Sequence, residues 1–166
     1  MPLSSQTKSA EKEIQLTTYL NRSDKKRVLE FWNTEFPKRL NFTHEDDFDK
    51  YLESLDIHNH YLVKSPNNEL LAWSMVFDRD NETWFAMIVN EPHQFQGIGK
   101  TLMSAMKKRT TQLNGWLVDH NNDIKSNGEN YLSKKDYYLK HDFKILDHSR
   151  LETQQISAVQ IQWEKA

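Results

Sequence analysis

One segment near the middle of the chain limits the folds open to it: an apolar strand that runs directly into a glycine-containing turn and then into an amphipathic helix. The strand is expected at residues 83–89, and the turn follows over residues 90–99. The helix is expected over residues 97–112, because apolar positions recur there at intervals of three, four and seven. These positions are Ile98, Leu102, Ala105, Met106 and Leu113.

The glycines of this turn give it the properties of an anion-binding site. The start of a helix presents about four backbone N–H groups without intrahelical acceptors, together with the positive end of the helix dipole. Gly97 and Gly99 place no Cβ between an approaching anion and the main chain. The spacing fits neither the three-glycine dinucleotide fingerprint nor the nucleotide-triphosphate loop. The turn is therefore predicted to hold phosphate.

The rest of the chain alternates between strand and helix patterns. Ser23 is expected to cap the first helix, and Thr43 with Asp46 resembles a capping box for the second. Strands are expected near 13–19, 58–64, 70–77, 83–89, 115–119, 143–147 and 156–163, and helices over 23–36, 43–55, 97–112 and from Ser133 onward. This order predicts an α+β fold, a mixed α/β sandwich whose central, mostly antiparallel sheet has about seven strands with helices on both faces.

Domain organisation follows from length and polarity. The chain has 166 residues, the length of one domain. Residues 1–11 are polar and are interpreted as an N-terminal arm, and residues 12–166 as a single domain. No apolar run approaches the ~20 residues of a membrane span, so no membrane association is expected.

Composition narrows the classes of function further. The formal net charge is −2, from 22 basic and 24 acidic residues, which argues against a non-specific nucleic-acid or membrane-surface binder. The chain has no cysteine, which excludes disulfides and thiol nucleophiles, and a cytoplasmic location is the expectation. Residues 119–123 and 58–60 imitate fragments of metal sites but lack the remaining ligands, so no metal is expected.

Two motifs in the chain resemble sequence motifs of one known family. Gln94-x-x-Gly97-x-Gly99 resembles the Q/R-x-x-G-x-G/A signature of the GNAT superfamily of N-acetyltransferases. Residues 137–143 resemble that family's later aromatic-Tyr-x-Lys/Arg-x-Gly-Phe motif, with Asp142 where glycine is usual. The resemblance covers residues 70–143 by motif and the remainder by element order. It implies a sheet that is splayed in the middle and a turn that binds the pyrophosphate of acetyl-CoA.

The resemblance also implies a set of site residues. Tyr138 corresponds to the tyrosine that can protonate the leaving thiolate, and Glu91 is the first candidate for the base, with His93 and Asp119 behind it. The cofactor-binding residues implied are Ile88, Val89, Gln94, Phe95, Gln96, Gly97, Ile98, Gly99, Lys100, Thr101 and Tyr138. The basic residues of the helix after the turn are either solvated or in part close to the cofactor's 3′-phosphate; they are Lys100, Lys107, Lys108 and Arg109.

The favoured hypothesis is therefore an acetyl-CoA-dependent N-acetyltransferase that moves an acetyl group to a primary amine by direct attack in a ternary complex. The acceptor is a small molecule or a peptide, and a homodimer, common in the family, is left open. A non-catalytic module that binds CoA or acetyl-CoA and an interaction protein that has lost the cofactor are the alternatives. The polar loop at residues 120–132 is interpreted as part of the cofactor or acceptor rim.

Overall fold

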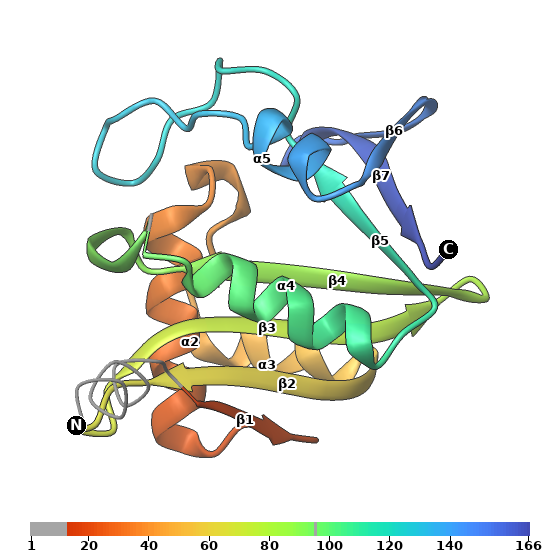
Figure 1. The fold of residues 1–166 in the computed structure, drawn as a ribbon. Helices are drawn as coiled ribbons and strands as arrows, with labels where there is room; N and C mark the ends of the chain where they lie inside the picture. Colours follow the sequence, from red (N-terminus) through yellow and green to blue (C-terminus); the bar gives the residue numbers. More distant parts are fainter. Residues whose placement is uncertain (1–12, 95) are drawn as a thin grey trace.

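The computed structural model describes residues 13–94 and 96–166. The predicted arm at residues 1–11 and the predicted cofactor residue Phe95 lie outside them. Within the described residues, seven strands form one sheet in the order β1-β2-β3-β4-β5-β7-β6 (Figure 1). The strands are β1 Ile14–Thr17, β2 Asp56–Lys64, β3 Leu70–Arg79, β4 Glu82–Val89, β5 Gln112–Leu117, β6 Lys144–Glu152 and β7 Ser157–Glu164.

Neighbouring strands are antiparallel at every step except between β4 and β5, which are parallel. The β2-β3-β4 meander forms because short polar turns separate three apolar runs. The predicted fold class is confirmed. Strand β5, which follows helix α4 (Ile98–Lys108), begins earlier than expected, at Gln112 rather than at Gly115.

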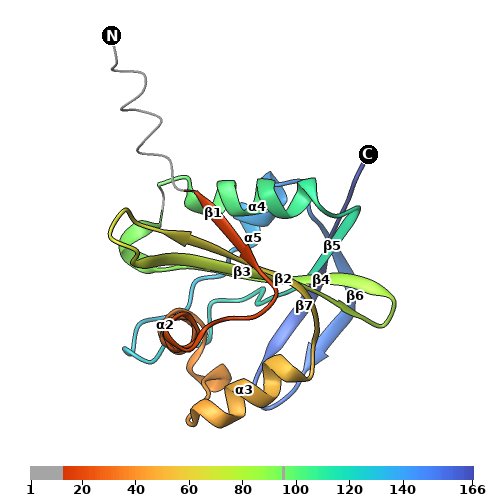
Figure 2. The same ribbon diagram turned by 90° about the horizontal axis from the view of Figure 1, so that it is seen from below.

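Helices cover both faces of the sheet (Figure 2). The helices α2 and α3 lie on one face, and α4 and α5 lie on the other. Their bounds are α2 Arg22–Glu35, α3 Glu45–Glu53, α4 Ile98–Lys108 and α5 Lys135–Lys140, with short 3-10 turns η1 Lys38–Leu40 and η2 Glu91–His93. None of these helices is long and apolar enough to cross a membrane, as far as the structure describes the chain.

Strand β3 lies between two hydrophobic clusters, one on each face of the sheet. On one face Trp73 packs near Trp32 of α2, with ring centroids 6.4 Å apart. On the other face Val76 belongs to the cluster of Leu102 and Met106 from α4. Alternation along a strand sends successive side chains to opposite faces, so one buried strand serves both clusters.

The first helix is capped by a residue other than the one predicted. Asn21 is the N-cap of α2, and its side chain accepts a hydrogen bond from the backbone N–H of Asp24 at 2.7 Å. Ser23 already lies inside the first turn, so its predicted capping role is wrong. Asparagine is as good a cap as serine, and the choice between neighbours depends on where the chain leaves β1.

Two other helix starts also differ from prediction. His44, not Thr43, is the N-cap of α3, and its side chain makes no capping hydrogen bond, so the Thr43–Asp46 capping box is wrong. The last helix begins at Lys135 rather than at Ser133. Ser133 still contributes, because its hydroxyl accepts from the backbone N–H of Lys135 at 3.3 Å.

Candidate active site

The sheet opens between its two parallel strands. Within the part of the chain that the structure describes, β4 and β5 pair at Trp84 and Asn114 alone, and beyond that point the strands diverge (Figure 1). The edge of β4 that faces β5 therefore lacks a strand partner over residues 85–89. Unpaired strand edges can hydrogen-bond an extended ligand as though it were another strand. The splay implied by the resemblance is confirmed.

Asn114 joins the two half-sheets where the opening begins. Its side chain is fully buried, and its amide group donates to the carbonyl of Thr83 at 3.0 Å. Its oxygen accepts from the side-chain amides of Gln160 at 2.8 Å and Gln162 at 3.0 Å, both on β7. Side-chain amides thus replace the missing ladder at the apex, which fixes where the opening starts.

The turn after β4 places the first turn of helix α4 at the mouth of the opening. Gly97 is the N-cap of α4 and has φ +80°, a left-handed conformation that favours glycine. Thr101 donates the first intrahelical bond, from its backbone N–H to the carbonyl of Gly97 at 3.0 Å. The amides of residues 98–100 precede it and have no intrahelical acceptor. A Cβ on Gly97 would meet nothing within 4 Å, which leaves open space beside these amides.

The signature glutamine holds this turn in place. Gln94 donates from its side-chain amide to the carbonyl of Val89 at 2.9 Å, so it fastens the turn to the end of β4. Gln96 makes a similar contact with the carbonyl of Pro92 at 3.3 Å. Both side chains therefore shape the turn from within, while the helix start remains at its surface.

The remaining predicted cofactor residues are distributed over three environments. Ile88 and Ile98 are buried, the first in the α2 cluster and the second in the α4 cluster. Lys100 is exposed, and the Thr101 hydroxyl donates to the carbonyl of Gly97 at 3.0 Å. Any contact of Ile88 or Ile98 with a ligand in the opening would therefore be made by main-chain groups.

A carboxylate that the sequence did not single out as a site residue lies behind the turn. The side chain of Glu35, at the end of α2, is only 9% exposed. It accepts from the backbone N–H of Glu91 at 2.8 Å and from Gln94 at 3.4 Å. Lys125 lies 3.7 Å from it. Glu35 thereby ties α2, η2 and the loop that follows β5 into one cluster.

The predicted base, Glu91, points away from the core. Its side chain is 61% exposed and lies 3.8 Å from Lys125. Among the described residues no hydrogen bond or ion pair joins Glu91 to Tyr138. Asp119, the reserve candidate, forms a two-pronged pair with Arg150 at 2.8 and 3.1 Å, which lowers the pKa of Asp119.

The loop between β5 and α5 is fastened to the early helices. Arg39 of η1 holds the buried carboxylate of Asp123 through two hydrogen bonds, at 2.8 and 3.0 Å. The same guanidinium donates to the carbonyl of Gln154, in the β6–β7 turn, at 3.1 Å. One side chain thus connects three segments that are far apart in the sequence, and the pair of bonds requires the forked geometry of arginine.

Two adjacent tyrosines of α5 face different neighbours. Tyr138 packs against Phe85 and Phe143, and burial raises the pKa of Tyr138. Tyr137 faces α4, and burial raises its pKa to about 12. The hydroxyl of Tyr137 is shielded from solvent and has no hydrogen-bond partner among the described residues. The helix ends at Lys140, and two residues later Asp142 has φ +69°, the left-handed conformation expected where the related motif has glycine.

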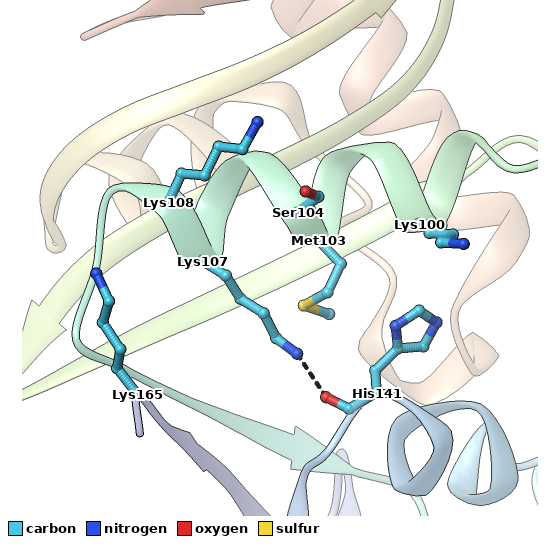
Figure 3. Close-up of a pocket in the computed structure, with 7 residues that line it drawn as sticks. All are labelled: Lys100, Met103, Ser104, Lys107, Lys108, His141 and Lys165. Carbon is cyan, nitrogen blue, oxygen red and sulfur yellow. Dashed lines mark hydrogen bonds between the residues drawn. The ribbon is translucent and has the colours of Figure 1, made fainter.

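A basic bay lies between α4, the end of α5 and the C-terminal residues after β7. It has a volume of about 350 Å³ and is lined by Lys100, Met103, Ser104, Lys107, Lys108, His141 and Lys165 (Figure 3). Lys107 donates to the carbonyl of His141 at 2.6 Å. Burial, Lys107 and Lys100 together lower the pKa of His141, as expected where cations gather. Through Lys100 the bay adjoins the first turn of α4.

Solved structures share this fold at low sequence identity. A GNAT-superfamily phosphinothricin acetyltransferase from Sinorhizobium meliloti, in complex with AcCoA, has a TM-score of 0.64 and 9% identity, over 92% of this chain and 89% of its own. A GNAT-family acetyltransferase from Staphylococcus aureus has a TM-score of 0.64 and 15% identity, over 93% and 100%. The ribosomal-protein-S18-alanine N-acetyltransferase from Escherichia coli has a TM-score of 0.60 and 13% identity, over 93% and 95%.

The sequence itself supplies the family assignment. No protein of curated function matches it significantly. Residues 25–126 match the model of the acetyltransferase (GNAT) family, which is more than half of the chain and includes the opening, the turn and the start of the β5–α5 loop. The chain therefore belongs to the GNAT family of acetyltransferases.

Proposed function

We propose that this enzyme is an acetyl-CoA-dependent N-acetyltransferase that transfers the acetyl group directly to a primary amine in a ternary complex. The observation that carries the proposal is the position of the Gly97 turn. A helix start with free amides lies at the mouth of an opening whose one wall is an unpaired strand edge. That combination suits a ligand with a pyrophosphate at one end and an amide-rich arm at the other.

The turn and the strand divide the proposed binding between them. The backbone amides of residues 98–100 would hold the pyrophosphate, with Gln94, Gln96 and Thr101 keeping the turn in shape. The main chain at Ile88 and Val89 would pair with the arm. Phe95 remains part of the proposed site on the strength of the motif alone. The basic bay would take the 3′-phosphate, because it continues from Lys100 along α4.

The reaction needs two proton transfers and one exchange of bonds. Bound acetyl-CoA supplies a thioester whose C–S bond breaks as the N–C bond to the amine forms, while the amine loses a proton and the sulfur gains one. Tyr138 is proposed as the proton donor, since its raised pKa keeps the hydroxyl protonated at neutral pH. Glu91 is proposed as the base, acting through water because its carboxylate is exposed.

The acceptor would enter on the side where Arg39 gathers η1, the β5–α5 loop and the β6–β7 turn. These segments carry carboxylates, amides and hydroxyls beside the exposed side chains of Ile124 and Leu132, and the polar groups are compatible with a polar amine. The similar structures include enzymes named for phosphinothricin and for a ribosomal-protein alanine. A small-molecule or peptide amine is accordingly the proposed acceptor class.

Calorimetric titration with acetyl-CoA, followed by a thiol-release screen of primary amines, tests the proposal. Wild-type protein should bind acetyl-CoA, and Gly97→Val should weaken binding at least tenfold by filling the space beside the amides. Gly128→Val is the matched control for backbone strain, since Gly128 also has positive φ and an open Cβ position but lies in the β5–α5 loop. Binding without thiol release from any amine would favour a non-catalytic CoA-binding module.

A further inference from the structure

We propose that Tyr137 is a cofactor-binding residue whose hydroxyl donates a hydrogen bond to the diphosphate of acetyl-CoA at the start of α4. The inference rests on the proposed function and gives Tyr137, the aromatic residue at the start of the later motif, a binding role that the motif does not state. Three observations carry it: the position of the hydroxyl, its lack of a partner and its fixed orientation.

The hydroxyl of Tyr137 lies beside the Gly97 turn that is proposed to hold the pyrophosphate. It is 2.9 Å from the position that a Cβ on Gly99 would occupy, and the Cγ2 atom of Val89 is 3.7 Å from that same position. Gly99 belongs to the first turn of α4, whose backbone amides lack intrahelical acceptors. A donor at this place adds to the amides that surround a bound phosphate.

The hydroxyl is also unsatisfied. It is buried and forms no hydrogen bond within residues 13–94 and 96–166. Buried hydroxyl groups are nearly always hydrogen-bonded, and one that is not costs free energy in the state that lacks the partner. A ligand oxygen at the turn would supply the missing acceptor.

The ring has little freedom to find another acceptor. It packs edge-on against Tyr138, with centroids 5.2 Å apart, and lies 4.4 Å from the ring of His141. Burial raises the pKa of Tyr137 to about 12, so the group remains a donor throughout the neutral range. A neutral donor facing a charged phosphate oxygen makes a stronger hydrogen bond than one facing a neutral carbonyl.

Tyr137→Phe removes only the oxygen and provides the test. The dissociation constant for acetyl-CoA, measured by calorimetry, should rise about tenfold, equivalent to about 1.4 kcal/mol. ADP, used as a competitor that carries the diphosphate without the pantetheine arm, should weaken by the same factor. Tyr19→Phe is the matched control, because Tyr19 is 72% exposed, and it should change neither constant. An unchanged ADP constant in Tyr137→Phe would overturn the inference.

Thermal unfolding of the free protein separates binding from a structural role. The free Tyr137→Phe protein should melt at the wild-type temperature or above it, because the variant removes an unsatisfied hydroxyl, while its stabilisation by acetyl-CoA should be smaller. A lower melting temperature without ligand would assign the hydroxyl a structural role and reject the inference. If wild-type protein binds neither acetyl-CoA nor ADP, the proposed function itself fails, which is a different result.

Discussion

The hydroxyl oxygen of Tyr137 and the α-carbon of Gly99 are so close that a methyl group on Gly99 would lie 2.9 Å from that oxygen. The next atoms around the same position are the Cζ of Tyr137 at 3.6 Å and the Cγ2 of Val89 at 3.7 Å, which are ordinary contacts. Gly99 is helical, so its backbone conformation does not require glycine. One oxygen atom on α5 therefore occupies the space that a side chain on Gly99 would need.

Gly99→Ala should consequently have opposite effects in two backgrounds. In wild-type protein it should reduce the free energy of unfolding by about 1–3 kcal/mol, as overpacking does. In Tyr137→Phe the same change should be neutral or stabilising by up to about 1 kcal/mol, because alanine favours helix more than glycine does. Urea denaturation of the four proteins of this cycle, without ligand, measures both values. An equal loss in the two backgrounds would show that the hydroxyl is not the conflicting atom.

Removing the buried carboxylate behind the turn should weaken cofactor binding from a distance. In Glu35→Ala the backbone N–H of Glu91 loses its acceptor and the amide of Gln94 loses one of its two, so the turn should loosen and the dissociation constant for acetyl-CoA should rise about tenfold. Glu35→Gln keeps an acceptor oxygen and should lose much less. Calorimetry compares both with Glu45→Ala, a change at an exposed position; equal losses in Glu35→Gln and Glu35→Ala would contradict this role.

Arg39→Lys should free the β5–α5 loop while leaving cofactor binding intact. A lysine cannot reproduce the paired hydrogen bonds to Asp123 together with the contact to Gln154. Limited proteolysis should then cut within residues 120–132 faster than in wild type, and KM for the amine found by the thiol-release screen should rise roughly fivefold. Arg22→Lys, an exposed change in α2, is the control. Unchanged proteolysis would mean that other contacts hold the loop.

The basic bay predicts a preference between two forms of the cofactor. Wild-type protein should bind CoA more tightly than dephospho-CoA, and Lys100→Gln combined with Lys165→Gln should reduce that preference roughly three- to fivefold, the range for exposed charge pairs. The preference should also shrink as salt is added. Lys26→Gln, on the opposite face of the sheet, should leave it unchanged. A preference that survives the double substitution would place the 3′-phosphate elsewhere.

His60 should make the fold sensitive to acid. Trp73 donates from its indole nitrogen to Nδ1 of His60 at 3.0 Å, and burial lowers the pKa of His60 from 6.5 to about 4. Between pH 4 and 6.5 the unfolded chain binds a proton on His60 that the native protein does not bind. The free energy of unfolding that depends on neutral His60 is therefore fully present above pH 6.5 and decreases as the pH falls toward 4. The loss should reach about 3 kcal/mol, since one pKa unit corresponds to about 1.4 kcal/mol.

The comparison of His60→Asn with His58→Asn isolates this effect. Asparagine offers the Trp73 indole an acceptor but does not titrate, so the denaturation midpoint of His60→Asn should vary less between pH 4.5 and 7 than that of wild type. His58 is exposed and has no contact with Trp73 in the hydrogen bonds of the described residues, so His58→Asn is the surface control for replacing a histidine by asparagine. A wild-type slope in His60→Asn would attribute the acid sensitivity to other groups.

The order of elements could be predicted from the sequence because hydrophobic periodicity and turn residues are local. The three central strands and the helix after the Gly97 turn lie where their patterns place them, within a few residues. Helix starts were less predictable. Asn21 and Ser23 are both good caps, and only the path of the chain out of β1 decides between them.

The candidate site was predictable only where a motif marks it. The turn that contains Gly97 is visible in the sequence, whereas Glu35 and Arg39 acquire their roles through contacts with residues more than fifty positions away. Tyr137 is a different case. Neighbours on a helix point about 100° apart, so a motif that implies a position for Tyr138 near the cofactor's sulfur does not fix the direction of Tyr137, which depends on how α5 packs.

The pairing between Trp84 and Asn114 is the apex of a V-shaped opening whose two arms are β4 and β5. Val89 lies five residues beyond the pairing on β4, about 16 Å along the strand. A rotation of a few degrees about the pivot is therefore amplified at the tips. The width between the tips, where the arm of the proposed cofactor would lie, therefore depends in part on the side-chain amides at the pivot.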